Sequence, residues 1–128
     1  MVNARLDAVK RAFENAAWFE CREVDPGCLR ICMPFTYPDG DLLDVFVVDA
    51  HDVLRVTDMG ETARYLETCE RWHEHAIQSM LGRSDIQLDR GEIYHDVVTV
   101  EDVPEAVWEL IQGIERICGA VRAKEISM

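Results

Sequence analysis

The sequence predicts an α+β fold: an antiparallel sheet, made of a three-strand meander and a C-terminal hairpin, packed by N-terminal, middle and C-terminal helices. Short apolar segments that alternate with polar residues, separated by turn residues, occupy positions 29–58 and recur at 86–98. Before, between and after them, apolar residues recur at helical spacing. A length of 128 residues with 48% hydrophobic content is typical of one domain, so we expect residues 1–128 to share one core.

The N-terminal segment is predicted to be a helix followed by an edge strand. Asn3 is a favourable N-cap residue, and the apolar spacing after it continues to a predicted helix end near Trp18. Residues 19–24 alternate only weakly, which indicates a short strand at the edge of the sheet. The Asp-Pro-Gly sequence at 25–27 then places proline and glycine where a tight turn favours them.

The meander is predicted from three apolar segments, at residues 29–33, 42–48 and 54–57. Pro34 ends the first segment because proline cannot donate to the ladder of a sheet. A Pro-Asp-Gly turn at 38–40 precedes the second segment, which is the most apolar and is therefore expected at the centre of the sheet. Connections this short make neighbouring strands antiparallel.

The meander is predicted to run directly into the middle helix. Asp58 and Glu61 have the spacing of a capping box, in which the first residue caps the helix and the second bonds back to it. Helical spacing of apolar residues persists from Met59 to Met80, which fits either one long helix or two helices with a kink. Gly82 is predicted to end this segment.

The C-terminal part is predicted to be a hairpin and a long helix. Residues 86–88 and 93–98 flank a turn in which Gly91 takes the left-handed position. Asp102 is the predicted N-cap of the last helix, whose first turn tolerates Pro104. This helix has the clearest apolar stripe in the chain, and we expect the stripe to pack across the sheet. The stripe consists of Val103, Val107, Leu110, Ile111, Ile114, Ile117 and Val121.

Charge restricts the class of partner. The chain has 25 acidic against 13 basic residues, a formal net charge of −12 and a pI near 4.6. Nucleic acids and anionic membranes repel such a chain unless its basic residues cluster, and its arginines are scattered along the sequence. We therefore expect no direct nucleic-acid binding and no membrane binding. The acidity serves solubility, or it docks the protein on a protein partner with a basic surface.

The sequence also indicates a compartment. Apolar runs such as residues 45–48 are far shorter than the roughly 20 residues of a membrane span. Residues 1–14 carry charges throughout and lack the apolar segment of a secretory signal. The five cysteines are odd in number and irregularly spaced, unlike a secreted disulfide framework. We expect a cytoplasmic protein.

Several chemistries lack their motifs. No CxxC or HExxH pattern, glycine-rich phosphate loop or GxSxG elbow occurs. Cys28 and Cys32 lie four apart on a predicted strand, about 13 Å from each other, and cannot share a zinc ion. Cys69 and His73 have i,i+4 spacing, for which a buried helical stripe is a simpler explanation than a catalytic pair. We expect no cofactor and assign no catalytic residue.

One group of carboxylates is predicted to gather at an end of the sheet. Some lie in the loop before the central strand, and the others follow the next strand. Because the second strand of a meander leaves this end and the third returns to it, the two sets should be near neighbours. Three interpretations of these carboxylates are open. They are residues that form turns and helix caps, oxygen ligands of a divalent metal, or an acidic edge on which a partner docks. The residues are Asp39, Asp41, Asp44, Asp58 and Glu61.

Motifs within residues 29–66 resemble a known family, the domain of unknown function 1828. The similar motifs are Met33-Pro34-Phe35, Asp39-Gly40-Asp41, Val56-Thr57-Asp58 and Gly60-Glu61-Thr62, followed by Leu66. Met33 departs from the threonine that the family often has, and the predicted helix after Thr62 continues without the family's usual glycine break. The resemblance implies a prokaryotic or phage-borne protein and mildly favours a role in phage–host conflict, but it implies no activity.

The sequence leaves three hypotheses about function. The first is an acidic interaction protein without catalysis that binds a basic partner, such as a nucleic-acid-handling protein. The second is a metal-assisted hydrolase or transferase that uses the acidic cluster. The third is a self-associating module, a homodimer formed through an exposed strand edge or helix. The sequence does not decide whether the protein is an enzyme, and the net charge of −12 with few lysines is the observation behind the first hypothesis.

Overall fold

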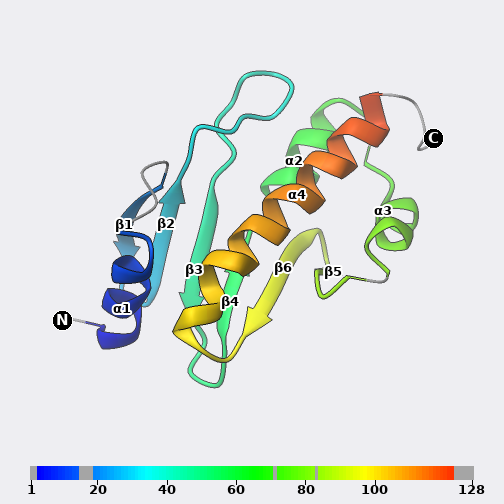
Figure 1. The fold of residues 1–128 in the computed structure, drawn as a ribbon. Coiled ribbons are helices and arrows are strands. Elements are labelled where there is room, and N and C mark those ends of the chain that lie inside the picture. Colours follow the sequence, from blue (N-terminus) through cyan, green and yellow to red (C-terminus); the bar gives the residue numbers. More distant parts are fainter. Residues whose placement is uncertain (1–2, 15–18, 71, 83, 123–128) are drawn as a thin grey trace.

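The fold is a six-stranded antiparallel sheet with helices packed against it (Figure 1). The computed structural model describes residues 3–14, 19–70, 72–82 and 84–122, with the side chains of 121 and 122 excepted. The sheet order is β1-β2-β3-β4-β6-β5, and each neighbouring pair is antiparallel. The elements are α1 Ala4–Ala12, β1 Glu20–Asp25, β2 Cys28–Cys32, β3 Val45–Asp49, β4 Leu54–Thr57, α2 Glu61–Thr68, α3 Glu74–Leu81, β5 Gln87–Asp89, β6 Glu92–Val97, a 3₁₀ turn Val100–Asp102 and α4 Val103–Arg122.

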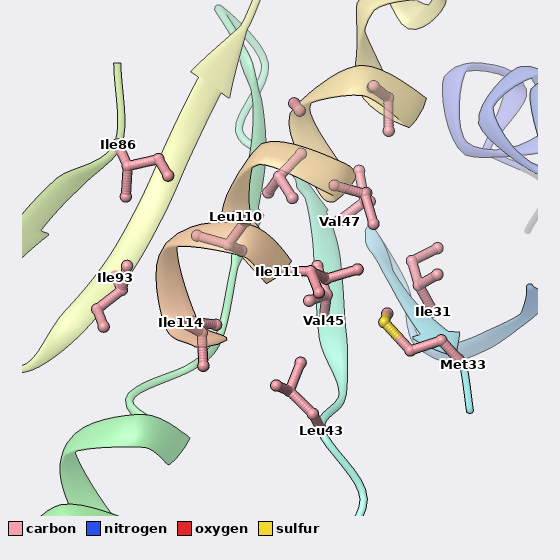
Figure 2. Packing of buried hydrophobic residues seen from close by; sticks show 14 of the residues in the cluster. Ile31, Met33, Leu43, Val45, Val47, Ile86, Ile93, Leu110, Ile111 and Ile114 are labelled. Carbon is pink, nitrogen blue, oxygen red and sulfur yellow. The ribbon is translucent and has the colours of Figure 1, made fainter. Parts of the chain in front are cut away.

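These elements confirm the predicted α+β fold, with β2-β3-β4 as the meander and β5-β6 as the hairpin. β1 is an edge strand, as predicted, and β3 lies inside the sheet. The apolar stripe of α4 crosses one face of the sheet, where side chains from β2, β3 and β6 point toward the helix (Figure 2). None of the described helices is long and apolar enough to cross a membrane.

Two predicted boundaries are wrong. α1 begins after the predicted cap, where the Asn3 side chain accepts from the Leu6 N–H at 3.1 Å, but it ends at Ala12 rather than near Trp18, which lies outside the described residues. β3 begins at Val45 rather than at residue 42. Leu42 forms only an isolated bridge to Thr36 and is 59% exposed, because it belongs to the loop before the strand.

The middle segment is two helices rather than one. α2 ends at Thr68, and Glu70 has a φ of 56°, a left-handed conformation that no helix can continue through. His73 then caps α3, where its Nδ1 accepts from the Ala76 N–H at 3.1 Å. Cys69 is exposed, so Cys69 and His73 do not share the buried helical stripe that their spacing suggested. The chain therefore breaks its helix here at a residue that is not glycine.

The C-terminal elements follow the prediction closely. Arg90 and Gly91 have φ values of 53° and 85°, the pair of positive angles that a type I′ hairpin turn requires. α4 begins at Val103, directly after the predicted cap Asp102, which lies in the 3₁₀ turn. The Asp102 carboxylate accepts from the Thr99 hydroxyl at 2.9 Å, and no bond from a helix N–H to it occurs among the described contacts. Gly82 is the C-cap of α3.

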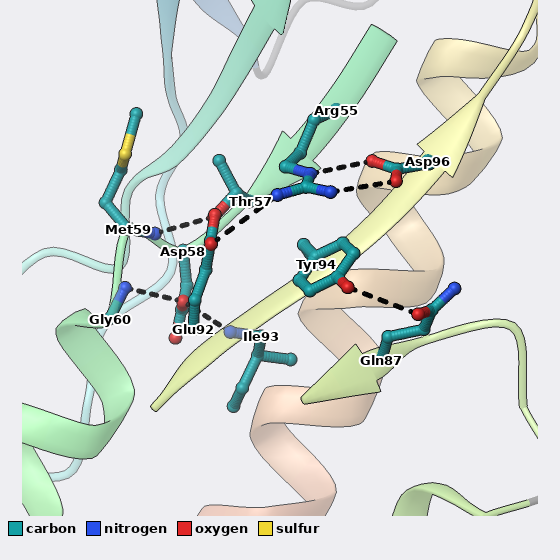
Figure 3. Close-up of polar contacts among 10 residues, drawn as sticks. All are labelled: Arg55, Thr57, Asp58, Met59, Gly60, Gln87, Glu92, Ile93, Tyr94 and Asp96. Carbon is teal, nitrogen blue, oxygen red and sulfur yellow. Dashed lines mark hydrogen bonds and ion pairs between the residues drawn. The ribbon is translucent and has the colours of Figure 1, made fainter. Parts of the chain in front are cut away.

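A buried carboxylate, Asp58, ties the end of β4 to α2 and β6 (Figure 3). Its Oδ1 accepts from the backbone N–H of Gly60 at 2.8 Å and from that of Ile93 at 3.0 Å. Its Oδ2 accepts from the N–H of Thr62 at 3.2 Å. One side chain thus satisfies backbone donors on three segments that meet at this end of the sheet.

The capping-box prediction is wrong in its pairing. α2 begins at Glu61, with Gly60 as its N-cap at a φ of 78°. The Glu61 carboxylate pairs with Arg64 at 2.9 Å instead of bonding back to Asp58. The Asp58 N–H that a capping box would use donates to the carbonyl of Ile93 at 3.0 Å, because β6 lies beside this residue.

Removal of the Asp58 carboxylate should destabilise the whole domain. Asp58→Ala leaves three N–H groups, two of them buried and that of Gly60 part-buried, without their acceptor, and each buried one costs roughly 1–3 kcal/mol. We expect the free energy of unfolding to fall by about 3 kcal/mol or more, measured by urea denaturation. Asp52→Ala, at an exposed position, is the control and should change it by less than about 0.5 kcal/mol. An equally small effect at Asp58 would contradict this role.

Asp58 should also give stability a pH dependence. Burial raises the pKa of its carboxyl above the usual 3.8, although the N–H donors of Ile93, Gly60 and Thr62 lower it. The stability that a raised acid pKa contributes is fully present below the usual pKa and is lost as the pH rises through the raised one. The difference in unfolding free energy between the wild type and Asp58→Asn should therefore shrink as the pH increases from about 4. A difference that grows with pH would mean that the donors outweigh burial.

Candidate functional site

The loop between β2 and β3 folds back on itself and presents two carboxylates at its tip. The N–H of Tyr37 donates to the carbonyl of Asp41, and the N–H of Gly40 donates to the carbonyl of Tyr37, both at 2.9 Å. Gly40 has a φ of 93°, a conformation that glycine adopts without strain. The carboxylate of Asp39 accepts from the N–H of Asp41 at 2.9 Å. Asp39 and Asp41 are therefore held in a defined turn.

Tyr37 anchors this loop to α2. Its side chain is buried, and its ring stacks on Tyr65 with centroids 5.1 Å apart and planes 26° apart. Its hydroxyl shares a hydrogen bond of 2.9 Å with the hydroxyl of Thr62. Burial raises the pKa of Tyr37, so the ring stays neutral in this position. The anchor fixes the distance between the loop tip and the first turn of α2.

Between the loop and α2 lies a hollow that we call the acidic groove, with a volume of about 460 Å³. Three of the five predicted site residues line it: Asp39, Asp41 and Glu61. The loop carboxylates and the start of α2 thus lie on one surface, as the order of strands in the meander predicts. The other lining residues are Tyr37, Leu42, Arg64, Tyr65, Thr68 and Cys69.

Asp44 and Asp58, the other two predicted site residues, are not among the residues that line the groove. Asp44 forms an ion pair with Arg30 across the neighbouring strands at 2.5 Å. This bond raises the pKa of the Arg30 guanidinium, so the arginine stays charged. Asp58 is buried and holds three backbone donors. Asp58 is therefore committed to the fold, whereas Asp44 pairs with Arg30 through Oδ2 and keeps a buried Oδ1 without a hydrogen-bond partner.

The groove combines negative charge with exposed apolar surface. Its lining includes the acids Asp39 and Asp41 together with Leu42 and Tyr65, and Leu42 is 59% exposed. Arg64 compensates part of the charge of Glu61 through their 2.9 Å ion pair. Burial, and to a smaller extent the hydrogen bond with Cys69, raises the pKa of Tyr65 to about 12, so its hydroxyl is protonated at neutral pH. Such a lining suits a cation with an aliphatic stem.

The groove acids do not converge on one point. Within the described residues, three metal-ligating atoms within 4.8 Å of one another occur at Asp85, His95 and Glu109, and not among the five predicted acids. A metal-assisted reaction at the predicted cluster remains a prediction without geometric support.

Sequence reasoning missed the aromatic residues of this site. Tyr37 and Tyr65 lie 28 positions apart in the printed sequence, on a loop and a helix, and neither belongs to a motif. Their only sequence signal is an aromatic residue next to the turn at 38–40, which a core residue explains equally well.

Comparison with known proteins identifies one similarity. Residues 33–117 match the family described as domain of unknown function DUF1828, which covers more than half of the chain. No curated protein and no solved structure matches the chain. The match includes the groove loop, α2, α3, the hairpin and most of α4. The chain therefore belongs to the DUF1828 family, and its acidic groove lies within the part that defines that family.

Proposed function

We propose that the protein is a non-catalytic interaction domain whose acidic groove binds a basic segment of a protein partner. The observation that supports this most directly is the groove lining, in which Asp39, Asp41 and Glu61 occur together with the exposed apolar Leu42. A lysine or arginine side chain fits this chemistry, because its charge pairs with the carboxylates while its stem packs on Leu42 and Tyr65.

The overall charge favours the same class of partner. A net charge of −12 attracts a basic protein over several ångströms and accelerates the encounter at low salt. Charge alone gives little specificity. The Tyr37–Tyr65 stack supplies the fixed geometry that a specific contact needs, since it holds the loop acids against α2.

The sheet face opposite α4 supports the expectation that nucleic acid is not the partner. Its arginines are engaged with acids: Arg22 with Glu20 at 2.9 Å, Arg30 with Asp44 at 2.5 Å and Arg55 with Asp96 at 2.8 Å. Arg55 also lies 3.9 Å from the centroid of the Tyr94 ring (Figure 3). A phosphate backbone would have to compete with each of these carboxylates for its arginine.

A basic partner, such as a nucleic-acid-handling protein, would present the cationic groove or tail that this site accepts. The proposal also includes a cytoplasmic location, expected from the sequence, and an association with phages or mobile elements, implied by the family resemblance. Self-association through a strand edge remains a prediction.

The proposal can be tested with a fluorescently labelled peptide that alternates arginine with alanine, by fluorescence anisotropy at low ionic strength. The triple variant Asp39→Asn, Asp41→Asn, Glu61→Gln should weaken binding about tenfold, since three exposed ion pairs contribute roughly 0.2–1 kcal/mol each. Binding by the wild type should weaken further as salt screens the charges.

The control is a second triple variant with the same change in net charge: Asp52→Asn, Glu101→Gln, Glu105→Gln. These residues are exposed and lie outside the groove. It should bind the peptide nearly as well as the wild type. Equal losses in both triple variants would show that net charge, not the groove, attracts the peptide, and would overturn the proposal.

A further inference from the structure

Three side chains that commonly bind metal ions converge far from the acidic groove. Asp85 precedes β5, His95 lies on β6 and Glu109 lies on α4. One potential ligand atom of each lies within 4.8 Å of the other two. β5 pairs with β6, and α4 packs against β6. The cluster thus joins three elements that are separate in the sequence.

The strand alternation of β6 turns His95 toward α4. Ile93, two residues earlier, is fully buried in the core beneath this helix, and residues two apart on a strand share a face. Tyr94 and Asp96 point to the opposite face, where they contact Arg55. The His95 side chain is only 12% exposed. Its imidazole is therefore largely withdrawn from water and directed at Glu109.

The buried Nδ1 of His95 lacks a hydrogen-bond partner. Oε2 of Glu109 lies 3.3 Å away, beyond the roughly 2.7–2.9 Å of a charge-assisted hydrogen bond. Buried polar atoms almost always have a partner, and an unsatisfied one calls for a specific explanation such as an ion. The nitrogen and the carboxylate oxygen lie at ion-pair distance when the imidazole is protonated, but no hydrogen bond joins them.

The separation of these two atoms suits a shared metal ion. Zinc binds imidazole nitrogen and carboxylate oxygen at about 2.0–2.2 Å, which places neighbouring ligand atoms roughly 3–3.5 Å apart. The distance of 3.3 Å between His95 and Glu109 falls in this range. An exposed loop carries Asp85, so its carboxylate can complete a three-ligand set with little cost to the core.

We propose that Asp85, His95 and Glu109 form a binding site for a divalent transition-metal ion. One imidazole and two carboxylates suit zinc, manganese, iron or cobalt better than calcium, which takes six or more oxygen ligands. Asp85 and Glu109 also line a pocket of about 270 Å³. A fourth ligand, such as water, has room on that side. The site is independent of the acidic groove.

Arg116 tunes this site by charge. It lines the same pocket as Asp85 and Glu109, and no ion pair joins it to either of them among the described contacts. The positive charge of its guanidinium repels a metal cation that approaches the site. Arg116→Ala should therefore bind the metal more tightly than the wild type.

The test uses the full chain, freed of metal by a chelator, and titrates it with Zn²⁺ by calorimetry and with Co²⁺ by absorption spectroscopy. We expect one equivalent to bind, with affinity reduced about 100-fold or more in His95→Gln, since even outer-shell changes cost 10–100-fold. His75→Gln, at an exposed position on α3, is the control and should bind like the wild type. The Co²⁺ complex should show no thiolate charge-transfer band, which excludes the cysteines as ligands.

Asp85→Ala keeps the test decisive if His95→Gln fails to fold. Asp85 is exposed in a loop, so this variant should fold and still lose most of its metal affinity. Absence of Zn²⁺ and Co²⁺ binding by the folded wild type would overturn the proposal. So would equal affinity of the wild type and Asp85→Ala, or a thiolate band. None of these results bears on peptide binding by the acidic groove.

Discussion

The packing of α4 against the sheet is the constraint on which the other features depend. The helix spans 20 residues, about 30 Å at the usual rise, and its buried residues repeat along its length from Val103 to Ala120. To cover this stripe, β2, β3, β4 and β6 must each turn alternate residues toward it. As a result, each polar side chain on these strands lies either on the face that α4 covers or on the opposite face of the sheet.

That assignment separates the chemistry of the molecule into distinct places. On β6, His95 goes beneath α4, whereas Tyr94 and Asp96 go to the opposite face. There they meet Arg55 in a compact set of ion pair and cation–π contact (Figure 3). The acidic groove belongs to neither face. It forms at the end of the sheet, where the chain leaves β2 and enters α2.

Local patterns in the sequence were sufficient for the fold and for part of the site. Alternation identified β2 and β6, the glycine at position 91 identified the hairpin turn, and the α4 stripe identified the covering helix. The sequence did not decide between one helix and two here, because helical spacing of apolar residues continues across Glu70. The break comes from the left-handed backbone of Glu70, and the sequence has no glycine at this position that would predict it. The start of β3 was misplaced because Leu42 is apolar yet exposed.

The site was predictable only where sequence neighbours remain neighbours in space. Asp39, Asp41 and Glu61 follow from the meander, since its strands bring both ends together. Asp58 was predicted only as a helix cap. Its second role, accepting from the N–H of Ile93, depends on β6, and Ile93 lies 35 positions later in the chain. The Tyr37–Tyr65 stack and the cluster of Asp85, His95 and Glu109 likewise depend on tertiary contacts that no periodicity encodes.

The edges of the sheet bear on how the molecule behaves at high concentration. Among the strands that the structure describes, β1 pairs only with β2, so its outer side leaves backbone donors and acceptors open to another strand. Most residues of β1 are exposed, and they include Glu20, Arg22 and Glu23. At the opposite edge, β5 has only three residues. A charged strand on one side and a short one on the other are common protections against edge-to-edge polymerisation, and they favour a sheet that ends with its own six strands.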